Sequence, residues 1–166
     1  MVLNLVENSF DELVGSLRIK NLWGIGIGVP GPVEFATGSP VSPPIMPGWD
    51  KYPLRERFST KYKVPVWVDN DVNLMALGEH TLRNDPLTNE LIFVKIGSGI
   101  GAGILTHGQL HRGAQGCAGD IGHIELPANE SVQCRCGNLG CLEAVSGGLA
   151  LIRDAELASK NKESIY

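Results

Sequence analysis

Residues 120–143 carry the most specific pattern in the chain, with DIGHIELP at 120–127 and CRCGNLGCLE at 134–143. The potential metal ligands in this stretch are His123, Cys134, Cys136 and Cys141. Three thiolates and one imidazole are the ligand set of a closed tetrahedral zinc site. A Cys-x-Cys pair is also poorly placed to form its own disulfide. We therefore predict a structural zinc site here, with free thiols in a reducing compartment as the alternative.

The overall composition is that of an ordinary globular chain. It has 166 residues, of which 43% are hydrophobic and 19% are charged, enough for one domain with its own core. The net charge of −4 argues against a nucleic-acid footprint. A zinc ribbon that binds nucleic acid would also have basic neighbours and two Cys-x-x-Cys knuckles, and the sequence shows neither. We expect no nucleic-acid contact through this chain.

The predicted location of the protein is the cytoplasm. No apolar run reaches the roughly 18 residues of a membrane span, so we expect no membrane partner. The acidic stretch at 1–14 does not have the pattern of a signal peptide. Cysteines gathered in a metal-like cluster suit a reducing compartment. The fourth cysteine, Cys117, is expected to be a small buried apolar residue.

Strand and helix signals alternate along the chain and predict an α/β fold. Residues 9–19 have helical apolar spacing behind a capping Ser9, with Glu12 three positions later. Apolar runs predict strands at 22–29, 64–68 and 91–96, and a further strand is expected at 103–106. Helices are predicted at 52–61, at 72–83 and from 142 to about 156. The proline-rich stretch 33–49 is expected to be a loop with a short strand at 33–36.

Three polar residues, Asp69, Asn70 and Asp71, stand where the second predicted strand gives way to a helix. Capping of the helix N-terminus is one explanation for them, but a cap needs only one such residue. A carboxylate at the C-terminal edge of a strand is also well placed to meet a ligand in an α/β sheet. Both interpretations, capping and ligand binding, remain open on this pattern alone.

The run GSGIG at 97–101 follows the third predicted strand. Such a loop lets backbone N–H groups come close to phosphate oxygens. It lacks the Gly-Lys-Ser/Thr ending of a Walker A loop, and the strand pattern after it does not fit the dinucleotide fingerprint. An ordinary hairpin turn is the alternative, although four glycines within 97–103 exceed what a hairpin needs.

Taken together, these motifs resemble the ROK family, which groups sugar kinases and sugar-responsive transcriptional repressors. The matching segments are the Gly122-His123 pair, CRCGNLGCLE at 134–143, NDVN at 70–73, and the turns GVPGPV at 28–33 and PPIMPGW at 43–49. The resemblance implies an α/β fold of the actin-like ATPase (ribonuclease H-like) type with a structural zinc loop. The glycine run between two strands resembles the second phosphate loop of that superfamily.

The resemblance also implies roles for individual residues. Asp71 would be the general base that takes the proton of a sugar hydroxyl as it attacks phosphorus. With Asp71, the implied sugar-binding residues are Gly31, Asn70, Asp120, His123 and Glu143. The implied contacts to ATP, which would bind with magnesium, are Gly97, Ser98, Gly99, Ile100 and Gly101.

Two positions depart from the pattern of the family's kinases. Ile45 stands where these kinases commonly carry Asn, and Asp120 stands where they commonly carry Glu. Because Asp is one methylene shorter than Glu, its reach to a sugar hydroxyl changes. Substitutions of this kind are seen among the repressor-type members of the family.

We read residues 1–166 as one ROK-type domain, truncated relative to the family's kinases. The sequence shows no Asp-x-Gly-x-Thr phosphate loop, no segment that closes over adenosine and no helix-turn-helix, so it is expected to be incomplete for catalysis. The predicted function is the sugar-binding core of an ATP-dependent hexose or N-acetylhexosamine kinase, similar to a glucokinase. The alternatives are the effector-binding part of a sugar-responsive repressor and an inactive fragment. A small-molecule sugar is the expected partner, and a homo-oligomer is the expected assembly.

Overall fold

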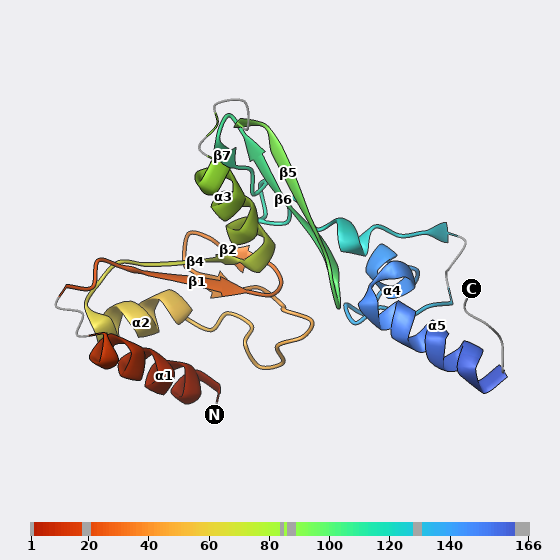
Figure 1. Cartoon of the computed structure of the whole chain (residues 1–166), viewed down its shortest axis with the longest axis horizontal. Helices are drawn as coiled ribbons and strands as arrows, with labels where there is room; N and C mark the ends of the chain where they lie inside the picture. Colours follow the sequence, from red (N-terminus) through yellow and green to blue (C-terminus); the bar gives the residue numbers. More distant parts are fainter. Residues whose placement is uncertain (1, 18–20, 84, 86–88, 128–130, 162–166) are drawn as a thin grey trace.

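The computed structural model describes residues 2–17, 21–83, 85, 89–127 and 131–161. The molecule is elongated, with its first helix and its last helix on opposite sides (Figure 1). Its elements are α1 (Val2–Ser16), β1 (Ile25–Val29), β2 (Val33–Glu34), β3 (Ser39–Pro40), α2 (Leu54–Tyr62), β4 (Val66–Asn70), α3 (Asp71–Arg83), β5 (Leu91–Ile96), β6 (Ile100–Thr106), β7 (Gln109–Leu110), the 3-10 helix η2 (Ile121–His123), α4 (Leu142–Ser146) and α5 (Gly148–Asn161).

The N-terminal part is built on strands β1 and β4, which pair in parallel from Ile25 opposite Val66 to Val29 opposite Asn70. Parallel strands need a crossover, and α2 lies within the one between them. The buried cluster of this part consists of Ile25, Val29, Val33, Leu54, Phe58, Val66 and Val68. The pairing brings the C-terminal ends of both strands to the same edge, where Asn70 donates a hydrogen bond to the Gly31 carbonyl at 3.0 Å.

The middle part is an antiparallel sheet of β5, β6 and β7, with α3 packed against β5 and β6 (Figure 1). Gly103 of β6 permits this close packing, because a Cβ there would lie 2.6 Å from the Val72 carbonyl oxygen. β5 alternates between half-buried and exposed residues. The exposed ones, Ile92, Val94 and Ile96, are 67%, 48% and 72% exposed and form an apolar row on the face away from α3.

The structure extends some predicted elements and divides another. The first helix begins at Val2, not at Ser9, and Leu3 and Phe10 of this helix pack against the N-terminal core. Residues 18 and 19 of the predicted helix lie outside the described residues. The single helix predicted from 142 onward is wrong: α4 ends at Ser146, and α5 begins at Gly148 after the extended residue Gly147.

Strand boundaries also differ from the prediction. β1 begins at Ile25 instead of residue 22, and β4 extends to Asn70, so Asp69 and Asn70 belong to the strand. β6 begins at Ile100, three residues before the predicted start, because its register with β5 continues to Ile96 opposite Ile100. Among the described residues, no helix combines the length and the apolar character needed to cross a membrane.

Candidate functional site

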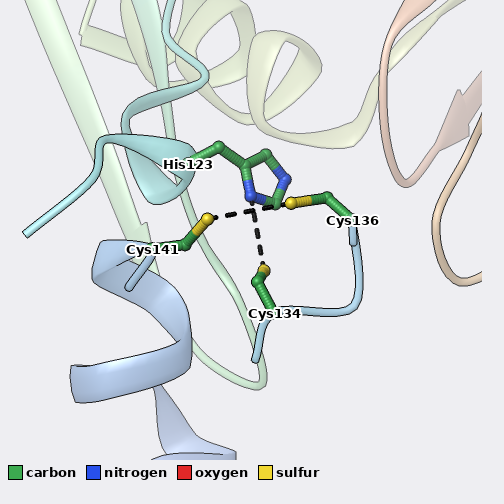
Figure 2. Close-up of side chains that lie close together, drawn as sticks. All are labelled: His123, Cys134, Cys136 and Cys141. Carbon is green, nitrogen blue, oxygen red and sulfur yellow. Dashed lines mark hydrogen bonds between the residues drawn. The ribbon is translucent and has the colours of Figure 1, made fainter. Parts of the chain in front are cut away.

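The four side chains that the sequence predicted as metal ligands lie together (Figure 2). The ligand atoms of His123, Cys134, Cys136 and Cys141 are all within 4.8 Å of one another. His123 comes from η2, Cys141 precedes α4, and the other two lie on the connecting loop. The Cys136 and Cys141 sulfurs are 3.7 Å apart. Two sulfurs bound tetrahedrally to one zinc ion, each about 2.3 Å from it, would be separated by about the same distance.

Two of the three cysteines of this cluster are buried, and Cys136 is half-buried. Cys134 is 5% exposed and Cys141 is 1% exposed. Burial raises the pKa of Cys134 to about 12 and also raises the pKa of Cys141. These sulfurs would therefore hold their protons at neutral pH unless a cation lies beside them. Both the spacing and the chemistry of the four groups fit a zinc ion.

A pocket with a volume of about 150 Å³ opens beside this cluster. A single water molecule needs only about 10–15 Å³ of such volume, so the pocket has room for a small organic ligand. The predicted substrate-binding residues that line it are Gly31, Asn70, Asp71, Asp120, His123 and Glu143. Of the glycine run, Ser98, Gly99, Ile100 and Gly101 line the pocket, whereas Gly97 does not. Residues from distant parts of the chain thus meet around one cavity.

The three polar residues after the second predicted strand have separate positions. Asp69 is 4% exposed and accepts hydrogen bonds from Arg112 at 2.9 Å and Asn73 at 3.0 Å, so it is held inside the fold. Asn70 caps α3, since its side-chain oxygen accepts from the backbone N–H groups of Val72 and Asn73. This leaves Asp71 as the carboxylate of the three that lines the pocket.

The Asp71 carboxylate has a partner that sequence reasoning missed. Its Oδ2 accepts a hydrogen bond from the ammonium of Lys95 at 2.7 Å, and its Oδ1 accepts from the backbone N–H of Val72 at 3.0 Å. Lys95 also lines the pocket. One signal was available in the sequence, because Lys95 is the single charged residue in the apolar strand LIFVKI directly before the glycine run.

Glu143 and Asp120 are two carboxylates that line the pocket near the Cys/His cluster. One oxygen of Glu143 accepts from the Ile100 N–H at 3.2 Å, and the other lies 3.5 Å from the Cys134 sulfur. Asp120 lies 3.8 Å from the His123 ring. Burial raises the pKa of Asp120, the nearby His123 lowers it, and the charge of Glu143 raises it further. Asp120 and Glu143 therefore offer carboxylate oxygens to a ligand on the side of the pocket beside the Cys/His cluster.

Two local predictions are settled by the geometry. The run 97–99 forms a three-residue hairpin turn between β5 and β6, in which the Gly97 N–H donates to the Gly99 carbonyl. The hairpin alternative thus describes its conformation, while residues 98–101 still line the pocket. The expectation that Cys117 is buried is wrong: it is exposed and lines the pocket, because its loop runs along the cavity's edge.

The chain is similar to sugar kinases and to sugar-responsive repressors. It is 37% identical to a glucokinase of Halalkalibacterium halodurans, over 97% of this chain and 49% of that protein. It is 41% identical to the xylose repressor of Caldicellulosiruptor bescii, over 92% of this chain and 37% of that protein. The chain therefore spans half or less of the length of these relatives.

Solved structures of both kinds have the same architecture. A ROK family transcriptional regulator, a homologue of the E. coli MLC protein, matches with a TM-score of 0.80 and 26% identity, over 98% of this chain and 41% of that one. A ROK family glucokinase from Streptomyces griseus, in complex with glucose and AMPPNP, matches with a TM-score of 0.75 and 28% identity, over 95% of this chain and 50% of that one. The α/β fold of the actin-like ATPase type is thereby confirmed. Residues 3–164 match the family's sequence model, and the chain belongs to the ROK family.

Proposed function

We propose that the pocket binds a sugar and that this chain carries the sugar-binding core of a ROK-type hexose or N-acetylhexosamine kinase. One observation carries the proposal: polar residues spread from Asn70 to Glu143 line a single cavity next to the Cys/His cluster. The Streptomyces griseus relative was solved with glucose, which supports a sugar of that class. Carboxylates and amides are well suited to sugar hydroxyls, because a hydroxyl both donates and accepts hydrogen bonds.

In this proposal Asp71 acts as the general base. The attacking sugar hydroxyl must lose its proton, and a carboxylate that lines the pocket can accept it. The turn residues Ser98 and Gly99 line the same pocket and would lie toward the phosphates of ATP, which binds with magnesium. Zinc, held by the four cluster residues, would connect η2, which carries His123, to the start of α4, which carries Glu143. Its role is structural.

The test is a sugar titration combined with a turnover assay. Calorimetry with D-glucose, D-xylose and N-acetyl-D-glucosamine should give a saturable heat for at least one sugar. A coupled assay with ATP and magnesium, on a form that turns over, should show Asp71→Asn inactive while the sugar still binds. Asp154→Asn, on the exposed surface of α5, is the matched control and should keep full activity. Absence of binding for every sugar, or equal turnover in both variants, would contradict the proposal.

A second function, effector binding in a sugar-responsive repressor, is favoured by a different observation. Lys95 occupies Asp71 Oδ2, one of the two oxygens that a general base would offer to the hydroxyl. Under this reading the same pocket holds the sugar, but no phosphoryl group is transferred. The two functions differ in the assay, because an effector site binds sugar with the same heat whether or not ATP is present.

The proposal also includes the cellular location and the assembly of the protein. Reduced thiols in the cluster require a reducing compartment, so we infer a cytoplasmic location. We also infer a homo-oligomer, which light scattering of the purified protein tests directly. Contact with nucleic acid through this chain is not expected at its net charge of −4.

A further inference from the structure

Lys95 is a charged residue on the face of β5 that packs toward α3. Leu91, Phe93 and Lys95 are the half-buried residues of this strand. Lys95 is the last of them, so its side chain meets the first residue of α3, Asp71, with 2.7 Å between Nζ and Oδ2. Opposite Lys95 on β6 is Gly101, where a Cβ would lie 3.3 Å from Val72 Cγ2, so the glycine lets α3 come close to the strand. Lys95, Asp71 and Gly101 all line the pocket.

Stability alone does not account for this lysine. The Lys95 and Asp71 side chains are 36% and 26% exposed, and ion pairs that solvent reaches contribute little to folding. The N-terminus of a helix also carries a partial positive charge, which disfavours a cation there. An uncharged residue at position 95 would avoid that cost and would continue the apolar face formed by Leu91 and Phe93. The position of the charge therefore points to a ligand.

The pair presents both kinds of hydrogen-bonding group to the pocket. An ammonium has three N–H donors, and among the described residues Asp71 is the hydrogen-bond partner found for Lys95. The Asp71 carboxylate is oriented by the hydrogen bond that its Oδ1 accepts from the Val72 N–H. The remaining lone pairs of its two oxygens are available to a ligand. A sugar hydroxyl is an acceptor and a donor at once, so one hydroxyl satisfies both members of the pair.

We propose that Lys95 is a specificity-determining residue of the pocket, whose ammonium donates a hydrogen bond to the same sugar hydroxyl that donates to Asp71. This inference rests on the proposed function, since it states how the pocket holds its sugar. The hydroxyl would sit between the two charges with its proton toward Asp71. In a kinase, the positive charge of Lys95 would also stabilise the negative charge that develops on that oxygen as the proton moves to Asp71.

The experiment pairs changes in the sugar with changes in the protein. Calorimetry is run with whichever of D-glucose, D-xylose and N-acetyl-D-glucosamine the wild-type chain binds, and with its deoxy and deoxyfluoro analogues at each hydroxyl. Fluorine accepts weakly but cannot donate. At one position the deoxy sugar should bind about tenfold to a hundredfold more weakly to the wild type, because it loses hydrogen bonds to charged groups. In Lys95→Met the ratio of dissociation constants between the deoxy sugar and the parent sugar should be about tenfold smaller at that position. At the other positions this ratio should not change.

Three further variants make the result specific. Lys95→Arg keeps a cation and donors and should restore most of the penalty. Lys160→Met, which removes an exposed lysine of α5, should match the wild type. Lys95→Thr gives a second test if Lys95→Met is poorly soluble, because its side chain is too short to reach Asp71. Thermal melting without sugar verifies that each variant is folded.

The outcomes separate this inference from the proposed function. If none of D-glucose, D-xylose and N-acetyl-D-glucosamine binds the wild type, the proposed function fails, and the inference fails with it. Suppose that a sugar binds, but that removing each hydroxyl weakens binding to Lys95→Met and Lys95→Thr by the same factor as binding to the wild type. The inference alone is then overturned. A penalty that shrinks equally at all positions would also overturn it, because that pattern reports a general loosening of the pocket.

Discussion

Glu143, in the first turn of α4, accepts a hydrogen bond from the backbone N–H of Ile100 at 3.2 Å, although 43 residues separate them in sequence. The second oxygen of the same carboxylate lies 3.5 Å from the sulfur of Cys134. One side chain thus connects the start of β6 to the Cys/His cluster. Glu143 therefore fixes the position of the hairpin relative to the Cys/His cluster, and these two segments form neighbouring walls of the pocket.

Replacing Glu143 should consequently destabilise the fold as well as weaken sugar binding. Glu143→Ala leaves the half-buried Ile100 N–H without its acceptor and should lower the free energy of unfolding by about 1–3 kcal/mol. Glu143→Gln retains an acceptor oxygen and should lose less than half of that amount. Urea denaturation followed by circular dichroism measures both. Equal stability of the two variants would show that the hydrogen bond is not what connects the walls.

The purified protein should contain about one zinc ion per chain. Chelation should lower its thermal midpoint, because metal binding and folding are coupled. Cys136→Ser should lose most of the metal, whereas Cys117→Ser, which lies outside the cluster, should retain it. Elemental analysis of both variants is the measurement. A folded wild-type protein with free thiols and no metal would refute the zinc site.

Asp120→Glu should change which sugar is preferred. The added methylene moves the carboxylate oxygens along the pocket wall, and a misplaced hydrogen bond costs roughly 1–3 kcal/mol. The ratio of dissociation constants for two sugars, for example D-glucose and D-xylose, should therefore shift by about fivefold to 150-fold. Asp154→Asn, far from the pocket, serves as the control. An unchanged ratio would mean that Asp120 does not contact the sugar.

Gly119→Ala should be strongly destabilising. A Cβ at this position would lie 1.9 Å from the Ala102 carbonyl oxygen, and the residue has a φ of +89°. We expect a loss of about 1–3 kcal/mol, from the clash and from the left-handed backbone together. Gly15→Ala is the matched comparison, because nothing lies within 4 Å of its Cβ position in α1, and it should be neutral or stabilising. Thermal melting of the two variants gives the contrast.

Acid should weaken the attachment of α1 to α2. Hydrogen bonds from Arg57 and then Lys61 hold the pKa of Glu7 below its ordinary value of 4.5. A depressed folded-state pKa means that the ion pairs stabilise the protein above about pH 4.5 and that this stability is lost as the pH falls through the folded-state pKa. Between about pH 6 and pH 3, Glu7→Gln should therefore lose less stability than the wild type, as measured by urea denaturation. Glu12→Gln, exposed on the same helix, should follow the wild type.

The parts of the structure that the sequence predicted well are those with short-range chemical patterns. His123, Cys134 and Cys141 could be assigned to one cluster because thiols and an imidazole at close spacing have few other uses. β1 and β4 were predicted because their apolar runs have the length of strands, whereas their parallel pairing was not predicted.

The parts that could not be predicted depend on contacts between distant segments. The start of α1 at Val2 is set by packing of Leu3 on the N-terminal core, which no local cap signals. The break at Gly147 was missed although two adjacent glycines, Gly147 and Gly148, mark a turn there, because the helical apolar spacing on both sides outweighed them. There the chain turns so that the Gly148 N–H reaches the Gly97 carbonyl at 2.7 Å. The pairing of Lys95 with Asp71 joins residues 24 positions apart, and a lysine in a strand does not reveal which face it occupies.

The exposed apolar row of β5 has a consequence for how the protein behaves at high concentration. The strand LIFVKI is six residues long, consists of aliphatic and aromatic residues apart from Lys95, and shows Ile92, Val94 and Ile96 to solvent. Short segments of this composition form cross-β fibrils when their charge is removed. A single cation within such a segment acts as a gatekeeper, because stacked copies of it repel one another. We therefore expect Lys95→Met, which removes this charge, to self-assemble more readily than the wild type at high concentration, as measured by thioflavin T fluorescence.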